Sequence, residues 1–209
     1  MTFGFAVALS DARVVPVLTV PSVRTAGPLA EALADGGAQC VEVTFRTPDA
    51  DQVVEQMAAQ GRLTVGAGTV LTAEQAERAV TAGARFVVSP GYDPDVDAVC
   101  RKLDVPFLPG VATPTELMRA LTAGLETVKL FPAELLGGLR MLRALAAPFP
   151  WARFMPTGGI GPAQTPGYLA EPAVLAVGGS WMAGPALLDR QDYQEIRRLT
   201  AESMEKSTP

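Results

Sequence analysis

Short runs of apolar and β-branched residues recur along the chain at regular intervals and predict β-strands. The first residues of successive runs lie 20 to 26 positions apart, which leaves room for one strand, one helix and two short loops. The eight runs are residues 14–20, 39–45, 63–70, 86–90, 106–111, 127–132, 153–158 and 174–179. The pattern therefore predicts a unit of one strand and one helix that is repeated along the whole chain.

Several intervals between these strands carry helix signals, with a polar residue or proline at the start and glycine after the end. Helices are predicted in this way at residues 25–34, 48–59, 72–82 and 113–123. Residues 159–173 are interrupted by prolines and predict a short helix or an extended loop. A short helix is also predicted at residues 1–9 and a last helix at 192–206, followed by a frayed tail.

Strict alternation of apolar strands and helices predicts an α/β fold with a parallel sheet covered by helices. Eight units favour a single (β/α)8 barrel of the TIM type, formed by residues 1–209 as one domain, with a short N-terminal helix added. A doubly wound open sheet is the alternative. It is disfavoured because no Gly-x-Gly-x-x-Gly motif follows the first strand.

Composition narrows the possible functions. The chain has 17 Lys+Arg against 22 Asp+Glu, and this net charge of −5 argues against a nucleic-acid binder or a protein of anionic membrane surfaces. Histidine is absent, which excludes Ser/His/Asp and Cys/His catalysis and the usual zinc sites. The sequence has neither a membrane-spanning run nor the basic start of a secretory signal, so a cytoplasmic protein is expected. Cys40 and Cys100 are expected to be buried thiols.

Chemistry is expected at the carboxyl ends of the strands, where barrels of this type carry their active sites. Lys129 lies in the middle of an apolar strand, where a charged ammonium is costly unless it is paired. A lysine that is kept from water is suited to Schiff-base chemistry with a ketone. A lysine that only forms an ion pair with a carboxylate is the alternative.

Alternation in the second strand sends Glu42, Thr44 and Arg46 to one face and the apolar residues between them to the other. In a barrel the polar face is the interior. Glu42 and Arg46 are separated by about 13 Å along an extended strand, so they lie at different depths. Glu42 is therefore expected near Lys129 as a general acid and base, and Arg46 at the mouth as a fork for a carboxylate or phosphate.

Two glycine-rich segments follow the seventh and eighth strands, where barrels commonly bind phosphate. The residues concerned are Thr157, Gly158, Gly159, Gly179 and Ser180. Paired glycines expose backbone N–H groups to an anion, and the Ser180 hydroxyl can donate as well. Tight turns without a ligand are the alternative, but two such segments at the two expected places favour a phosphate site.

Several ordered motifs at the predicted strand ends carry a family resemblance. They are Val-Pro-Val (15–17), Glu-Val-Thr-Phe-Arg-Thr (42–47), Gly-Ala-Gly-Thr-Val (66–70), Ser-Pro-Gly (89–91), Pro-Gly-Val (109–111), Lys-Leu-Phe-Pro-Ala-Glu (129–134), Pro-Thr-Gly-Gly-Ile (156–160) and Gly-Gly-Ser-Trp-Met (178–182). Together they resemble the class I pyruvate aldolases that act on 2-keto-3-deoxy-6-phosphogluconate (KDPG), and often on 4-hydroxy-2-oxoglutarate (KHG). The resemblance covers nearly the whole chain.

The resemblance implies roles for the candidate residues. Lys129 would form the Schiff base, Glu42 would move protons, and the glycine-rich segments would bind phosphate. Arg46 and Thr69 would bind the substrate carboxylate, and Thr44, Pro90 and Phe131 would line the pocket. It also implies a homotrimer and a reaction that needs neither a metal nor a cofactor.

The implied reaction cleaves a phosphorylated 2-keto acid, KDPG, into pyruvate and glyceraldehyde 3-phosphate, and KHG into pyruvate and glyoxylate. Three alternatives remain: a phosphogalactonate aldolase of the same family, a phosphosugar isomerase or synthase, and a catalytically silent phosphosugar-binding barrel. An isomerase gives no reason for a lysine and a glutamate together inside the barrel. A silent protein would lack a catalytic group, and none is missing.

Overall fold

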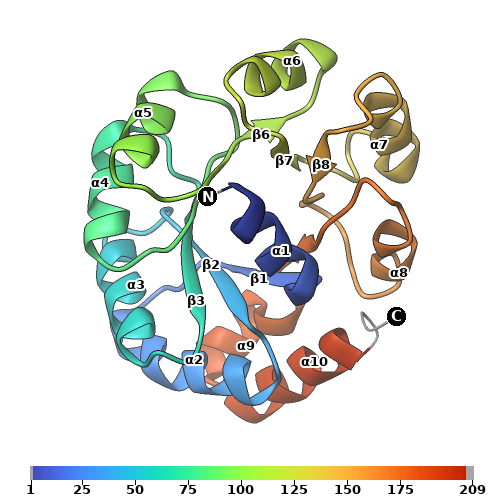
Figure 1. The fold of residues 1–209 in the computed structure, drawn as a ribbon. Helices are drawn as coiled ribbons and strands as arrows, with labels where there is room; N and C mark the ends of the chain where they lie inside the picture. The colour runs from blue at the N-terminus through green and yellow to red at the C-terminus, as the bar shows by residue number, and fades with distance from the viewer. Residues whose placement is uncertain (1, 206–209) are drawn as a thin grey trace.

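The structure is a computed structural model that describes residues 2–205. Its strands are β1 (Val14–Leu18), β2 (Cys40–Thr44), β3 (Thr64–Gly68), β4 (Val87–Val88), β5 (Phe107–Leu108), β6 (Gly110–Val111), β7 (Thr127–Leu130), β8 (Arg153–Phe154) and β9 (Val177–Gly179). They form a six-stranded sheet in the order β5-β4-β3-β2-β1-β9 and a three-stranded sheet in the order β6-β7-β8. Figure 1 shows these strands around a common axis with helices outside them. The paired strands are parallel, which confirms the predicted α/β class.

Pro109 divides the predicted fifth strand into β5 and β6. Proline has no N–H to donate to a neighbouring strand, although the Pro109 carbonyl accepts a hydrogen bond of 2.8 Å from the Lys129 N–H. On the other side of the small sheet, two isolated parallel bridges, Phe154 with Val174 and Thr157 with Gly178, lead towards β9. Each predicted run therefore contains strand structure, and the two sheets approach each other at both of their edges.

The helices alternate with the strands along the chain. They are α1 (Thr2–Ala12), α2 (Ala26–Asp35), α3 (Ala50–Ala59), α4 (Ala73–Thr81), α5 (Pro94–Lys102), α6 (Pro114–Thr122), α7 (Gly138–Ala146), α8 (Thr165–Leu169), α9 (Pro185–Arg190) and α10 (Tyr193–Glu205), with two short 3-10 helices at Val23–Thr25 and Trp181–Ala183. The predicted starts are confirmed at α4 and α6, where the side chains of Thr72 and Thr113 cap the first turn. The proline-rich interval does contain only a short helix, α8.

The helix predictions at the two chain ends agree with the structure as far as it describes them. The first helix continues to Ala12, beyond the predicted end, while Met1 lies outside the described residues. The last helix reaches Glu205, and Lys206 and the tail predicted to fray also lie outside the described residues. Within residues 2–205, no helix combines the length and the apolar character needed to cross a bilayer.

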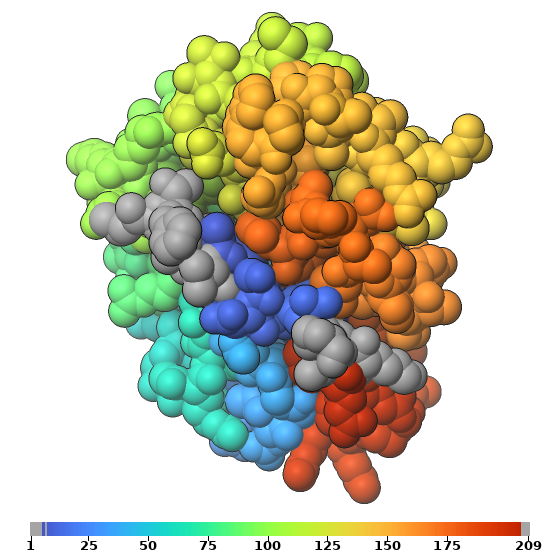
Figure 2. All heavy atoms as spheres, turned by 45° about the vertical axis from the view of Figure 1, so that its right-hand side comes forward, coloured from blue at the N-terminus to red at the C-terminus, as the bar shows by residue number. Residues whose placement is uncertain are grey.

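Helix α1 covers one end of the ring of strands (Figure 1), and Figure 2 shows the same helix lying across that face of the molecule. Its Leu9 and Ala12 pack into an inner apolar cluster with residues of the strands, among them Val15, Phe86 and Met155. A larger cluster lies between the strands and the outer helices. The inner cluster fills the amino ends of the strands, which leaves their carboxyl ends for polar residues.

Candidate active site

Lys129 and Glu42 form an ion pair inside the ring of strands. Lys129 Nζ lies 3.0 Å from Glu42 Oε1, and the two side chains are 6% and 0% exposed. Glu42 stands at the centre of β2, level with Val17 of β1 and Gly66 of β3, while Lys129 projects from β7. The structure thus brings together the two residues that the sequence singled out from separate strands.

The surroundings of the pair fix the Glu42 carboxylate but leave one oxygen unused. A Cβ atom at Gly68 would lie 2.1 Å from Glu42 Oε1, so this position of β3 has room for the carboxylate only because it is glycine. Glu42 Oε2 is buried and makes no hydrogen bond within the described part of the chain. A buried acceptor without a partner is costly, which marks Oε2 as a group available to a ligand, water or proton.

Lys129 also faces the aromatic ring of Phe131. Its Nζ lies 5.3 Å from the ring centroid, within the range of a cation–π contact. Phe131 follows Lys129 by two residues and therefore lies on the same face, one step closer to the carboxyl ends of the strands. The ammonium is held between an anionic group and an aromatic face.

A cavity of about 300 Å³ opens on that side of the ion pair. Its wall includes most of the predicted pocket and phosphate residues: Thr44, Arg46, Phe131, Thr157, Gly158, Gly159, Gly179 and Ser180. Lys129 and Glu42 do not line it themselves. Thr44 and Phe131, each two residues further along the chain, do line the cavity and link it to the pair.

The glycine-rich segments form one side of this cavity. Gly158 and Gly159 have φ angles of +102° and +82°, a left-handed backbone that suits glycine. The parallel bridge of Thr157 with Gly178 engages the Gly158 N–H, whereas the Gly159 N–H makes no backbone hydrogen bond within residues 2–205. Ser180, at the end of β9, is exposed beside them. A free N–H group and a hydroxyl beside one hollow are suited to an anion such as phosphate.

Two predicted residues lie near the cavity without lining it. Thr69 directly follows Gly68, which pairs with Thr44, and it has a φ of +55°. Pro90 is exposed after the buried Ser89, and its carbonyl lies against Gly110. Both stand at the carboxyl edge of the strands, so a ligand larger than the cavity would be needed for them to make contact.

Sequence reasoning missed several residues of the cavity wall, namely Val17, Thr19, Ile160, Gly178, Ala183, Pro185 and Leu188. A signal for two of them was present. Val15 belongs to the inner cluster, so period-2 alternation places Val17 and Thr19 on the same inner face. Gly178 belongs to β9, and the remaining four depend on how the loops after the last two strands fold back, which no local pattern reveals.

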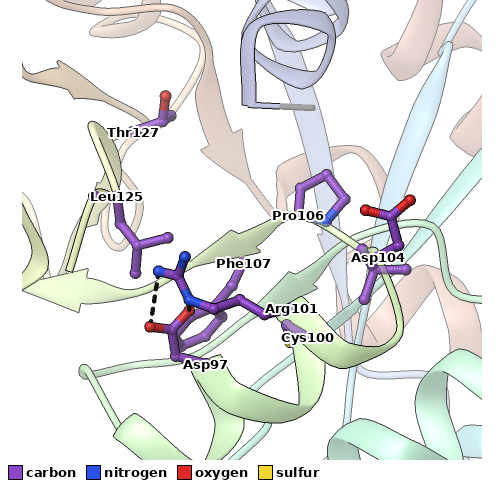
Figure 3. Close-up of a pocket in the computed structure, with 10 residues that line it drawn as sticks. Asp97, Cys100, Arg101, Asp104, Pro106, Phe107, Leu125 and Thr127 are labelled. Carbon is purple, nitrogen blue, oxygen red and sulfur yellow. Dashed lines mark hydrogen bonds and ion pairs between the residues drawn. The ribbon is translucent and has the colours of Figure 1, made fainter.

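A second cavity, of about 210 Å³, lies at the other ends of the strands (Figure 3). Its wall includes Phe107 and Thr127, the first residues of β5 and β7. Two of its charged residues are already paired with each other: Arg101 Nε lies 2.9 Å from Asp97 Oδ1, and the same guanidinium donates to the Ala123 carbonyl at 2.5 Å. This cavity is therefore a poorer candidate than the one beside Lys129.

Both cysteines are free and buried, as predicted. Burial raises the pKa of the Cys40 thiol to about 12, with a further contribution from the negative charge of Glu42. Burial likewise raises the pKa of Cys100 to about 12, aided by Asp97. Neither thiol is a nucleophile at neutral pH.

Comparisons with known proteins identify the family of this chain. Residues 6–199 match the family model described as KDPG and KHG aldolase. A 2-dehydro-3-deoxy-phosphogluconate aldolase of Treponema pallidum is 47% identical over 199 residues, which cover 95% of each chain. The KHG/KDPG aldolase of Escherichia coli K12 is 41% identical, over 94% of this chain and 93% of the relative.

A solved structure gives the same result in three dimensions. The KDPG aldolase of Legionella pneumophila, with pyruvate captured at low pH as a covalent carbinolamine intermediate, superposes with a TM-score of 0.90 and 38% identity. The match covers 94% of this chain and 96% of that one. The protein described here therefore belongs to the KDPG and KHG aldolase family.

Proposed function

We propose that this protein is a class I aldolase that cleaves KDPG into pyruvate and glyceraldehyde 3-phosphate, and KHG into pyruvate and glyoxylate. The observation that carries the proposal is the buried pair of Lys129 and Glu42, with 3.0 Å between Nζ and Oε1, beside a cavity with an anion-binding wall. The names of the relatives at 41% to 47% identity support the gluconate-type substrate over the phosphogalactonate alternative.

The proposed reaction begins when the neutral amine of Lys129 attacks the C2 carbonyl of the substrate. The carbinolamine loses water to give an iminium, which is the electron sink. Glu42 takes the proton of the C4 hydroxyl, the C3–C4 electron pair moves towards the iminium, and the aldehyde leaves. Protonation of the resulting enamine at C3 and hydrolysis by water then release pyruvate and restore the lysine.

The remaining contacts hold the two ends of the substrate. Arg46 and Thr69 bind its carboxylate, and Thr157, Gly158, Gly159, Gly179 and Ser180 bind its phosphate, while Thr44, Pro90 and Phe131 shape the pocket. The free Gly159 N–H and the position of Arg46 in the same cavity wall support this assignment. The two anionic ends of KDPG thus bind to different sides of one hollow, and the keto group lies between them.

The same proposal includes the closed (β/α)8 barrel, a homotrimer and a cytoplasmic location. The bridges from the β8 segment to the β9 segment support closure, as does the continuity of β5 and β6 across Pro109. A closed barrel explains why Lys129 and Glu42, on strands that are far apart in the sequence, meet at its centre.

A direct assay tests the function. The purified protein should convert KDPG into pyruvate and glyceraldehyde 3-phosphate, each measured with its own coupling dehydrogenase, and full activity should survive a strong chelator. Pyruvate and a hydride reductant should add one pyruvyl group, seen by intact mass. Absence of both cleavage and adduct would support a silent binding protein, and isomerisation without cleavage would support the isomerase alternative.

The phosphate assignment makes a separate prediction. Ser180→Asp adds a negative charge and removes a donor at the exposed edge of the cavity. It should lower kcat/KM for KDPG by about 1 to 3 kcal/mol, or about 5- to 150-fold. KHG has no phosphate, so its cleavage should be affected much less. For KDPG, the loss in Ser180→Ala should lie between no loss and the loss in Ser180→Asp. Equal losses on both substrates would mean that Ser180 supports the fold rather than the phosphate.

A further inference from the structure

Thr19 and Thr44 form a hydroxyl pair in the cavity that the catalytic scheme leaves unused. Their Oγ1 atoms lie 2.8 Å apart, and either can be the donor. Thr44 is buried at 2% exposure, whereas Thr19 is exposed, and both line the cavity wall. We propose that this pair recognises the C5 hydroxyl of the substrate and makes the enzyme selective for aldehydes that carry that hydroxyl. The inference rests on the proposed aldolase function.

Hydrogen-bond accounting supports a ligand for this pair. Two threonine hydroxyls have two protons, and one of these lies in the bond between them. Within residues 2–205, neither hydroxyl makes another hydrogen bond. One donor and several lone pairs therefore face the cavity, which matches a substrate hydroxyl that can accept and donate at once.

The depth of the pair indicates which substrate hydroxyl it meets. Thr44 follows Glu42 on the same face of β2, about 6.8 Å closer to the mouth. In the proposed scheme Glu42 serves the C4 hydroxyl, because that proton must leave during cleavage. The next hydroxyl towards the phosphate is that of C5, and the phosphate loops form another part of the same cavity wall.

The neighbours on β1 and β2 make the pair the first polar group above the reacting carbons. Val17 stands level with Glu42 and is apolar, so it offers no hydrogen bond to C4 or C5. Arg46 follows in the turn after β2 ends at Thr44, and the proposed scheme assigns it to the substrate carboxylate rather than to C5. Thr19 and Thr44 are thus left as the polar contacts at the intermediate depth.

The test uses the addition direction, in which two acceptor aldehydes differ only in the hydroxyl concerned. Pyruvate is added either to glyceraldehyde 3-phosphate or to 3-phosphopropanal, which lacks the hydroxyl that becomes C5–OH. The unmodified enzyme should prefer the hydroxylated aldehyde by tenfold or more in kcat/KM, since loss of a hydrogen bond to a buried group is costly. Thr19→Val should lower the value for glyceraldehyde 3-phosphate and largely remove the preference.

Matched variants separate hydrogen bonding from packing. Thr19→Ser keeps the hydroxyl and should keep the preference, whereas Thr44→Val should lose it as Thr19→Val does. The double variant should lose no more than either single one, because the two hydroxyls act as a unit. Since Thr44 is buried, the melting temperature of each variant is compared. If Thr44→Val does not fold, the test rests on Thr19→Val alone.

The outcomes are distinct. Persistence of the preference in Thr19→Val, equal losses on both aldehydes, or no preference in the unmodified enzyme would each overturn the role of the pair. Failure of the unmodified enzyme to add pyruvate to either aldehyde would instead refute the proposed function. Trapping of pyruvate alone should be unchanged in Thr19→Val, because pyruvate has no hydroxyl at this depth.

Discussion

Lys129→Ala should abolish both reductive trapping of pyruvate and cleavage of KDPG. The nucleophile would be gone, and Lys102, the other lysine within residues 2–205, neither lines the cavity nor pairs with Glu42. Intact mass after pyruvate and hydride, together with a coupled cleavage assay, measures both effects. The exposed Lys102 of α5 provides the matched control, and Lys102→Ala should keep the adduct and the activity.

A loss of activity in Lys129→Ala through unfolding has to be distinguished from a loss through the missing nucleophile. Removing the ammonium leaves the Glu42 carboxylate, at 0% exposure, without its cation, a change that typically costs about 3 to 5 kcal/mol. Lys129→Arg keeps a positive charge near Glu42 but its guanidinium does not form an imine. Lys129→Arg should therefore be inactive, but its melting temperature should fall less than that of Lys129→Ala. Normal trapping in either variant would move the Schiff base to another residue.

Glu42→Gln should lower turnover by about 10² to 10⁴ while the protein still folds and binds substrate. Glutamine preserves the shape of the side chain and an oxygen within reach of Lys129, but it does not exchange protons. Turnover of KDPG and the exchange of the pyruvate methyl protons with deuterated water, followed by NMR, measure the effect. Glu126→Gln, at an exposed glutamate just before β7, is the control.

The alternative role of Glu42 is that of a counter-ion only. In that case Glu42→Gln would shift the pH profile of the reaction and largely preserve its maximal turnover. Exchange of the methyl protons at the unmodified rate would require another residue as the proton carrier. If Glu42 is the proton carrier, its Oε2 is the atom placed to accept the proton, because Oε2 is buried and has no hydrogen-bond partner in the described chain.

The sequence predicted which side chains face the interior wherever alternation along a strand determines their direction. Period-2 alternation predicted that Glu42, Thr44 and Arg46 share a face, and the structure places Glu42 against Lys129 and the other two in the cavity wall. The apolar Val41 and Val43 lie in the outer cluster, as the same alternation requires. Local spacing was sufficient because a strand has only two faces.

Other features depend on non-local geometry or weak signals. Helix α7 starts after Gly137 in a left-handed conformation, so the polar or proline start used to predict helices was missing. The 3.0 Å distance between Lys129 and Glu42 depends on how the strands curve around their axis, which no sequence window contains.

Gly66 has a structural role as well: a Cβ atom there would lie 2.2 Å from the Phe86 ring.

The helix across the amino ends of the strands has a consequence for the order of events. Leu9 of α1 and the Phe86 and Met155 side chains beneath it are at most 2% exposed, so apolar side chains close the ring of strands at that end. Reactants and products must then pass through the same mouth. In the proposed scheme pyruvate is bound to Lys129, and the aldehyde lies between pyruvate and the mouth. The difference in depth predicts the order of release, in which the aldehyde leaves first and pyruvate last. In the reverse direction pyruvate must bind first.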